Sequence, residues 1–246
     1  MTVTTLTSAA EVLLATEHDP YVRGSLRRPD VAGWAGHDAV AWRATDAQER
    51  TPYLMTLGPP PAVARLIEAL LPELRDQTRV TLPRGTAPLL PAWVALDGTD
   101  WDFRWLGAPP ALQPGEERVE PLEASDVGAL LAVASPTASA LPGDPGVRRW
   151  VGVRGPEGLL ACAADTSAAT GVGHLSSIAV HPDARSQGLG AAVTARLMRD
   201  LFADGCDLAT LGMYAENTAG RALYDHLGMA DAHRFTSGPL QVRSRW

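Results

Sequence analysis

The sequence contains no lysine, because all 21 basic residues are arginine. A nucleotide-binding P-loop uses a lysine to hold the phosphates, and Schiff-base or pyridoxal chemistry uses a lysine amine. The sequence therefore excludes these three classes of function.

Cysteine is almost as scarce, with Cys162 and Cys206 as the two thiols of the chain. Two thiols can build neither a disulfide framework nor a four-cysteine zinc site. The His-Glu-x-x-His and Gly-x-Ser-x-Gly motifs are also missing, which counts against zinc proteolysis and α/β-hydrolase chemistry. We expect both cysteines to be small core residues in a reducing compartment, and we expect no metal site.

The chain also lacks the features of export, membrane insertion and nucleic-acid binding. Its N-terminus has no basic start, and no apolar run reaches the ~18 residues of a membrane span. The net charge of −7 is spread along the chain without a basic face. We therefore expect a cytoplasmic protein that binds neither membrane nor nucleic acid.

Proline is distributed unevenly, since 18 of the 20 prolines lie at or before residue 156. The stretch "GAPPALQPGEE" at 107–117 has the composition of a linker. We therefore place a domain boundary near 117, which gives domains 1–117 and 118–246. Both domains mix strand and helix patterns, so the fold class is α/β.

In the first domain, strand patterns cover 39–45, 53–57 and 102–106, and a helical pattern covers 62–74. Ser8 and Glu11 have the spacing of a helix capping box. In the second domain, a short strand near 119–122 precedes a helix with Ser125 as its N-cap. A hairpin, a strand, a helix, a strand and a helix follow at 148–165, 171–180, 188–204, 206–214 and 217–228. Two last strand patterns cover 229–236 and 239–245.

The segment "SIAVHPDARSQGLGAAVTARLM" at 177–198 joins a strand to a helix through a loop that contains Gly188 and Gly190. The first N–H groups of a helix have no partner within the helix, and the helix dipole adds about half a positive charge there. Glycine lets a phosphate approach these amides, which run here from Gln187 to Ala191. The loop therefore predicts a pyrophosphate site, with a tight loop that needs only backbone freedom as the alternative.

Two motifs in this half resemble the GNAT superfamily of acyl-CoA-dependent N-acyltransferases. The run from Arg185 through Gly188 to Gly190 fits its [Q/R]-x-x-G-x-[G/A] motif, and "ENTAGRALYDHLGM" at 216–229 resembles its second signature. Both lie at strand–helix junctions in the expected order. The resemblance covers roughly 118–246 and implies the GNAT fold, a mixed central sheet with helices on both faces.

The resemblance implies acetyl-CoA as the cofactor. Its pantetheine arm would lie along the fourth strand, where that strand splays from the fifth, and its pyrophosphate would lie on the loop amides, with a charge contact from Arg185. The full implied set is Ser177, Ile178, Ala179, Val180, Arg185, Gln187, Gly188, Leu189, Gly190, Ala191, Asn217, Ala219 and Tyr224.

In this family a neutral amine attacks the thioester directly, so the reaction needs a base, an oxyanion donor and an acid. The resemblance implies Tyr224 as the general acid and the amide of Ile178 or Ala179 as the oxyanion donor. The base stays open between His174, Glu216, Asp165 and a chain of waters, with His174 and Glu216 as our hypothesis.

The first domain repeats the strand–loop–helix order in "YLMTLGPPPAVARLIEALL" at 53–71. Prolines 59, 60 and 61 have no N–H group, so this loop cannot offer the same row of amides. We predict a degenerate copy of the same fold that binds no coenzyme A, with an unrelated α/β domain as the alternative.

The sequence thus predicts an acetyl-CoA-dependent N-acetyltransferase in tandem-domain form. The expected acceptor is a primary amine of a small molecule or a peptide, and a homodimer stays open. The alternatives are a non-catalytic acyl-CoA sensor or partner-binding module, and a transferase for another acyl group.

Overall fold

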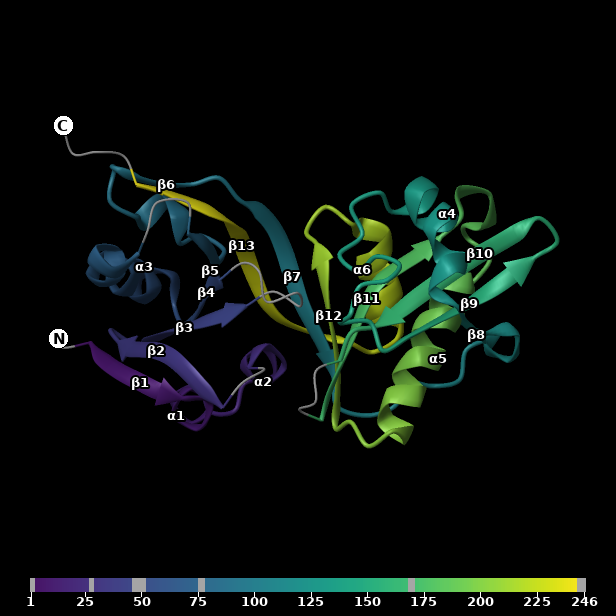
Figure 1. Ribbon diagram of the computed structural model, residues 1–246, viewed down its shortest axis with the longest axis horizontal. Helices are drawn as coiled ribbons and strands as arrows, with labels where there is room; N and C mark the ends of the chain where they lie inside the picture. The colour runs from purple at the N-terminus through teal and green to yellow at the C-terminus, as the bar shows by residue number, and fades with distance from the viewer. Residues whose placement is uncertain (1–2, 27–28, 46–51, 75–77, 168–170, 243–246) are drawn as a thin grey trace. The chain divides into compact units, whose positions relative to one another are not determined.

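The computed structural model describes residues 3–26, 29–45, 52–74, 78–167 and 171–242. The chain forms two compact units. Unit 1 contains Met1–Phe103, Tyr214–Glu216 and Asp231–Trp246, and unit 2 contains Arg104–Met213 and Asn217–Ala230. Figure 1 traces the chain through both units, from the purple N-terminus to the yellow C-terminus.

Unit 2 is built on a mixed sheet with helices on both faces. Its strands are β8 (Glu120–Leu122), β9 (Arg149–Gly155), β10 (Gly158–Asp165), β11 (Val172–Val180) and β12 (Leu208–Tyr214). Its helices are α4 (Ala124–Ala134), α5 (Leu189–Ala203) and α6 (Thr218–His226). The strands lie in the order β8-β9-β10-β11-β12. Neighbours from β8 to β11 are antiparallel, and β11 and β12 are parallel.

Alternating side chains of the unit 2 sheet supply two separate hydrophobic cores. Ala161 and Ala163 of β10 pack into a core with α5, whereas Cys162 and Ala164 pack into a core with α4. This alternation is the period of two that a strand buried on both faces requires. The predicted α/β class with helices on both faces is confirmed.

The predicted stacking of α5 is confirmed, because Val193, Leu197 and Leu201 are all buried. The expected N-cap of α4 was wrong. Glu123 caps this helix instead of Ser125, and Asp126 accepts a hydrogen bond of 3.0 Å from the Glu123 N–H. Ser125 lies one position inside the first turn, where its hydroxyl cannot act as the cap.

Unit 1 contains strands β1 (Thr4–Ser8), β2 (Asp30–Gly36), β3 (Ala39–Thr45), β4 (Pro52–Leu57), β5 (Arg79–Pro83) and β6 (Val94–Leu96). Its helices are α1 (Ala9–Ala15), α2 (Pro20–Ser25) and α3 (Pro60–Leu70), and short 3-10 turns cover Leu71–Glu73 and Ala87–Leu89. The predicted Ser8–Glu11 capping box is present at α1. Strand β7 (Thr99–Leu106) begins in unit 1 and ends in unit 2.

The two units repeat one topology. In unit 1 the strands lie in the order β1-β2-β3-β4-β5. Neighbours from β1 to β4 are antiparallel, and β4 and β5 are parallel. This is the pairing of β8 to β12. In each repeat a single helix, α3 or α5, connects the two parallel strands. The predicted internal repeat is therefore confirmed in its topology.

The boundary expected near 117 differs from the division that the structure shows. Unit 2 begins at Arg104, and the proline-rich segment at 107–117 is anchored rather than free. The Glu116 side chain is buried, accepts a hydrogen bond of 2.6 Å from the Gln113 N–H and lies 3.5 Å from the Arg199 guanidinium of α5. Composition alone suggests a linker here, because such long-range anchors leave no local pattern.

The C-terminal segment also corrects the expected domain 118–246. One strand, β13 (Ala230–Val242), replaces the two strands expected at 229–236 and 239–245, and residues 243–245 lie outside the described residues. β13 is antiparallel to β5 and β6, and both Phe235 and Leu240 are fully buried. The chain therefore returns to complete unit 1 after α6.

No helix among the described residues is both long enough and apolar enough to span a membrane. The longest, α5, has 15 residues.

Candidate active site

Strands β11 and β12 pair over only part of their length. The parallel register runs from Val172 opposite Leu208 to Leu175 opposite Leu211. β11 then continues to Val180 and β12 to Tyr214, and the two strands do not pair further with each other among the described residues. The edge of β11 that faces β12 therefore opens at residues 176–180, as the resemblance implied.

A β-bulge marks this opening. The register between β10 and β11 shifts between the pairs Ala164–Ser176 and Cys162–Ala179, and Ser177 has a φ of 50°. Its hydroxyl accepts a hydrogen bond of 2.9 Å from the N–H of Ala140 and donates one of 2.8 Å to the Ala140 carbonyl. The segment between α4 and β9 is thus fastened to the bulge, which offsets the strain of a non-glycine residue at positive φ.

The loop before α5 presents its amides as predicted. Gly188 is the N-cap residue with a φ of 77°, and Ala192 is the first residue of the helix whose N–H bonds back, at 3.0 Å to the Gly188 carbonyl. Among the described residues no group accepts from the N–H of Leu189, Gly190 or Ala191. The helix dipole makes this row of donors electropositive, so it fits an anionic phosphate.

The loop side chains leave these amides accessible. Gln187 and Gly188 are exposed, as is Arg185. No atom lies within 4 Å of the place where a side chain on Gly188 would begin. The open space above Gly188 is the approach that a pyrophosphate would need.

The matching loop of unit 1 is closed to this role. Pro59 is the N-cap of α3 and Pro60 is its first residue. Ala62 is the first residue with an N–H, which bonds to the Pro59 carbonyl at 2.9 Å. The first turn of α3 therefore lacks the row of free N–H groups that the first turn of α5 has.

Helix α6 positions Asn217 and Tyr224. The Asn217 side chain caps the helix by accepting a hydrogen bond of 2.8 Å from the Gly220 N–H, as predicted. The Tyr224 ring packs in the α5 core with 6% of its surface exposed. Burial raises the pKa of Tyr224 to about 12, and the charge of Arg104 opposes that rise. The phenol is therefore protonated at neutral pH, as a proton donor must be.

Arg104 is the buried cation beside Tyr224, and the sequence analysis did not identify it. It reaches from β7 to α6, where it forms an ion pair with Asp225 and donates to the carbonyls of Arg221 at 3.3 Å and Met229 at 3.0 Å. The Met229 carbonyl follows the C-terminal end of α6, where the helix dipole favours a cation. No local pattern could have revealed it, because Asp225 is 121 residues away in the sequence.

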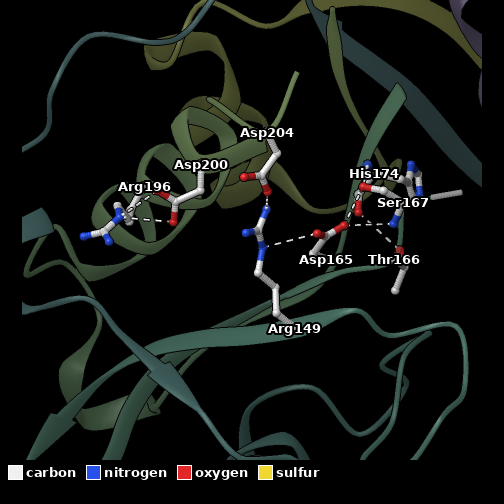
Figure 2. Close-up of polar contacts among 8 residues, drawn as sticks. All are labelled: Arg149, Asp165, Thr166, Ser167, His174, Arg196, Asp200 and Asp204. Atoms are coloured by element: carbon white, nitrogen blue, oxygen red, sulfur yellow. Dashed lines mark hydrogen bonds and ion pairs between the residues drawn. The ribbon is translucent and has the colours of Figure 1, made fainter. Parts of the chain in front are cut away.

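His174 lies on β11 just before the opening. Its Nδ1 is 2.9 Å from the hydroxyl oxygen of Thr210 on β12, and its main-chain N–H donates to the Ser167 hydroxyl at 2.9 Å. Figure 2 shows the second of these contacts and the Asp165 carboxylate beyond it. The structure thus holds His174 from β12 on one side and from the segment that follows β10 on the other.

Asp165, the third candidate for the base, is already held by hydrogen bonds and an ion pair. Its carboxylate is almost fully buried, accepts from the N–H of Ser167 at 2.9 Å and forms a 3.2 Å ion pair with Arg149 (Figure 2). Arg149 also reaches Asp204 at the end of α5, at 2.6 Å. This chain of charges ties β9, β10 and α5 together, so Asp165 has a structural role.

The remaining predicted residues lie at the surface or along β11. Glu216 and Ala219 are exposed at the start of α6, whereas Ala179 is buried and Ile178 and Val180 are partly buried. Among the described residues no group of three or more histidine, cysteine, aspartate or glutamate side chains could hold a metal ion.

The comparisons with known proteins agree with this geometry. Residues 137–229, which lie in unit 2 except for Tyr214–Glu216, match the model of the acetyltransferase (GNAT) family. No curated protein sequence matches the chain.

The solved structures that are similar support the same fold across the whole chain. A GNAT-family acetyltransferase from Novosphingobium aromaticivorans is 20% identical with a TM-score of 0.55, over 95% of this chain and 97% of that one. A GCN5-related N-acetyltransferase from Kribbella flavida is 19% identical with a TM-score of 0.54, over 94% and 95%. A tandem GNAT protein from the clavulanic acid biosynthesis pathway is 14% identical with a TM-score of 0.51, over 97% and 98%.

Proposed function

We propose, because residues 137–229 match the model of the acetyltransferase (GNAT) family, that the protein transfers an acetyl group from acetyl-CoA to a primary amine of a small molecule or peptide. The observation that carries this proposal is the row of amides at the start of α5, which have no hydrogen-bond partner among the described residues and lie beside the open edge of β11. A phosphate site next to an open strand edge suits a long cofactor with a diphosphate at one end and an extended arm at the other.

Acetyl-CoA supplies the activated acetyl group, and this chain supplies the groups that bind and orient it. The N–H groups from Gln187 to Ala191 hold the pyrophosphate, with Arg185 as an exposed counter-charge. The main chain from Ser177 to Val180 holds the arm. The amide of Ile178 or Ala179 hydrogen-bonds the thioester oxygen, where negative charge develops.

Tyr224 donates a proton to the departing sulfur. Its high pKa keeps it protonated, and the nearby Arg104 charge stabilises the phenolate that remains afterwards. Asn217 fixes the first turn of the same helix, and Ala219 lies beside it with a side chain too small to obstruct the arm.

The acceptor amine must lose a proton, which His174 or Glu216 takes directly or through water. His174 sits in a fixed hydrogen-bond network, whereas Glu216 is exposed in the turn before α6.

A test of this function measures free thiol release from acetyl-CoA with a panel of primary amines. The expected result is amine-dependent release of coenzyme A together with an acetylated amine in the mass spectrum. Binding of acetyl-CoA without release would indicate an acyl-CoA sensor. Release from succinyl-CoA or a longer acyl-CoA, but not from acetyl-CoA, would indicate another acyl group.

We further propose that unit 1 binds no coenzyme A. The reason is its proline-closed loop, which lacks the donors that a pyrophosphate requires. Isothermal titration of the full chain with coenzyme A is expected to give one site per chain. A stoichiometry of two would contradict this proposal, since it would require a second diphosphate site in unit 1.

A further inference from the structure

The β-bulge of β11 is tied to the segment between α4 and β9 through one side chain. The Ser177 hydroxyl accepts from the N–H of Ala140 and donates to the carbonyl of the same residue, at 2.9 and 2.8 Å. It thus satisfies both main-chain groups of one residue, as the main chain of a neighbouring strand does in a sheet. Ala140 is buried, and no other group among the described residues bonds to its N–H or its carbonyl. Loss of the hydroxyl would therefore leave two main-chain groups of a buried residue without a partner.

The segment that Ser177 reaches is itself held in place. The N–H of Leu141 donates to the Asp144 carboxylate at 2.8 Å, and the N–H of Val147 donates to the Asp144 carbonyl at 3.1 Å. Ala140 packs into the core shared with α4, and Val147 packs against that core. The segment therefore gives the bulge a fixed point of attachment.

Ser177 lies where β11 has one residue more than the strand beside it. Between the two residue pairs that flank the bulge, β10 has one residue and β11 has two, Ser177 and Ile178. Ser177 has a φ of 50°, which is unfavourable for a residue other than glycine. From β10, the Cys162 thiol adds a weak hydrogen bond of 3.8 Å to the Ser177 carbonyl. A bulge changes which main-chain groups face the neighbouring strand and which face the open edge, so the conformation of Ser177 determines where the amides of Ile178 and Ala179 point.

We propose that Ser177 is a positioning residue, whose hydroxyl holds the bulge to Ala140 and so keeps the amide of Ile178 or Ala179 in place for the thioester oxygen. This inference rests on the proposed function and adds a side chain to it. The hydroxyl gives its proton to Ala140, so it acts through the main chain rather than on the cofactor. An oxyanion donor stabilises the transition state only when its position is fixed, so a displaced amide lowers kcat more than it lowers cofactor affinity.

The test compares Ser177→Ala and Ser177→Gly with the wild type. Both variants remove the hydroxyl, but glycine adopts positive φ without strain and so separates the hydrogen bonds from the backbone conformation. We expect kcat to fall by about 10- to 100-fold in both, the range for a misplacement of about 1 Å at a reacting centre. The dissociation constant for coenzyme A is expected to stay unchanged, because the pyrophosphate amides lie at the start of α5. Wild-type kcat in Ser177→Gly, or a dissociation constant that rises as much as kcat falls, would overturn the inference.

Amide hydrogen exchange, measured by NMR without ligands, tests the attachment apart from the reaction. The Ala140 amide is expected to exchange slowly in the wild type and about 10-fold faster in both variants, because a buried hydrogen bond is lost from the closed state. Equal exchange in all three proteins would overturn the inference. A wild type that releases no thiol with any amine would instead refute the proposed function, and hydrogen exchange would still decide whether Ser177 holds Ala140.

Ser25→Ala is the matched control. Ser25 is a partly buried serine of unit 1 whose hydroxyl also makes one bond of each kind. It donates to the Val22 carbonyl at 2.9 Å and accepts from the Trp42 indole N–H at 3.1 Å. The variant is expected to lose thermal stability and to keep wild-type kcat. An equal fall of kcat in Ser25→Ala and Ser177→Ala would show an effect through stability alone and would contradict the inference.

Discussion

Replacing Gly188 with valine is expected to raise the dissociation constant for coenzyme A by about 100-fold or more, because each lost charge-assisted hydrogen bond costs about 1.5–3 kcal/mol. Gly188 has a φ of 77°, a region that a β-branched residue strongly disfavours. Valine would therefore turn the backbone away from the conformation that exposes the amides, and its methyl groups would occupy the space above them. Isothermal titration with coenzyme A measures the change.

Gly190→Val should weaken binding for a different reason. A Cβ at this position would lie 3.4 Å from Leu223 and 3.5 Å from Val180, which are ordinary contacts. The two further methyl groups of valine have no such space, so they either displace these neighbours or project toward the phosphate site. The expected loss of affinity is again about 100-fold, by the same count of lost hydrogen bonds.

Gly205→Val is the control for backbone strain. Gly205 has a φ of 91° and follows the C-terminal end of α5, so it carries a similar conformational cost at the opposite end of the same helix. Its replacement is expected to lower thermal stability and to leave coenzyme A binding intact. If Gly188→Val bound coenzyme A as tightly as Gly205→Val, the loop would not be the diphosphate site, and the proposed cofactor site would be wrong.

The parts of the site that the sequence predicted are local in the chain. The glycine loop and its helix lie within one short segment, and the Asn217 cap and Tyr224 share one helix. Such features depend on turn chemistry and helical periodicity, which neighbouring residues determine. The repeat was also visible, because its strand–loop–helix order recurs in sequence.

The parts that the sequence did not reveal depend on pairing between distant segments. Thr210 meets His174 because of the register between two parallel strands, and Arg104 meets Asp225 across much of the chain. The return of β13 to unit 1 is equally non-local, since its residues follow α6 but pair with β5. A strand pattern indicates that a strand exists, but it does not identify the neighbour with which it pairs.

Tyr224→Phe is expected to lower kcat by about 100- to 10,000-fold, the range for loss of a general acid. The ring stays in place in phenylalanine, so the α5 core and the affinity for coenzyme A should be retained. The change removes the proton that neutralises the thiolate. Steady-state kinetics with the preferred amine, together with titration of coenzyme A, would separate the chemical step from binding.

The pH dependence of stability gives an independent check on the environment of Tyr224. A tyrosine has a pKa of about 10 in the unfolded chain, and burial raises the pKa of Tyr224 to about 12 in the folded protein. Protonated Tyr224 therefore contributes stability that is complete below pH 10 and is lost as the pH rises toward 12. Tyr224→Phe is expected to remove this part of the stability loss at alkaline pH.

Tyr21→Phe is the matched control for activity, since Tyr21 is also buried, with 4% of its surface exposed, but lies in unit 1. Wild-type kcat in Tyr224→Phe, or an equal fall in Tyr21→Phe, would rule out Tyr224 as the proton donor, because the phenol would then affect activity through folding or not at all.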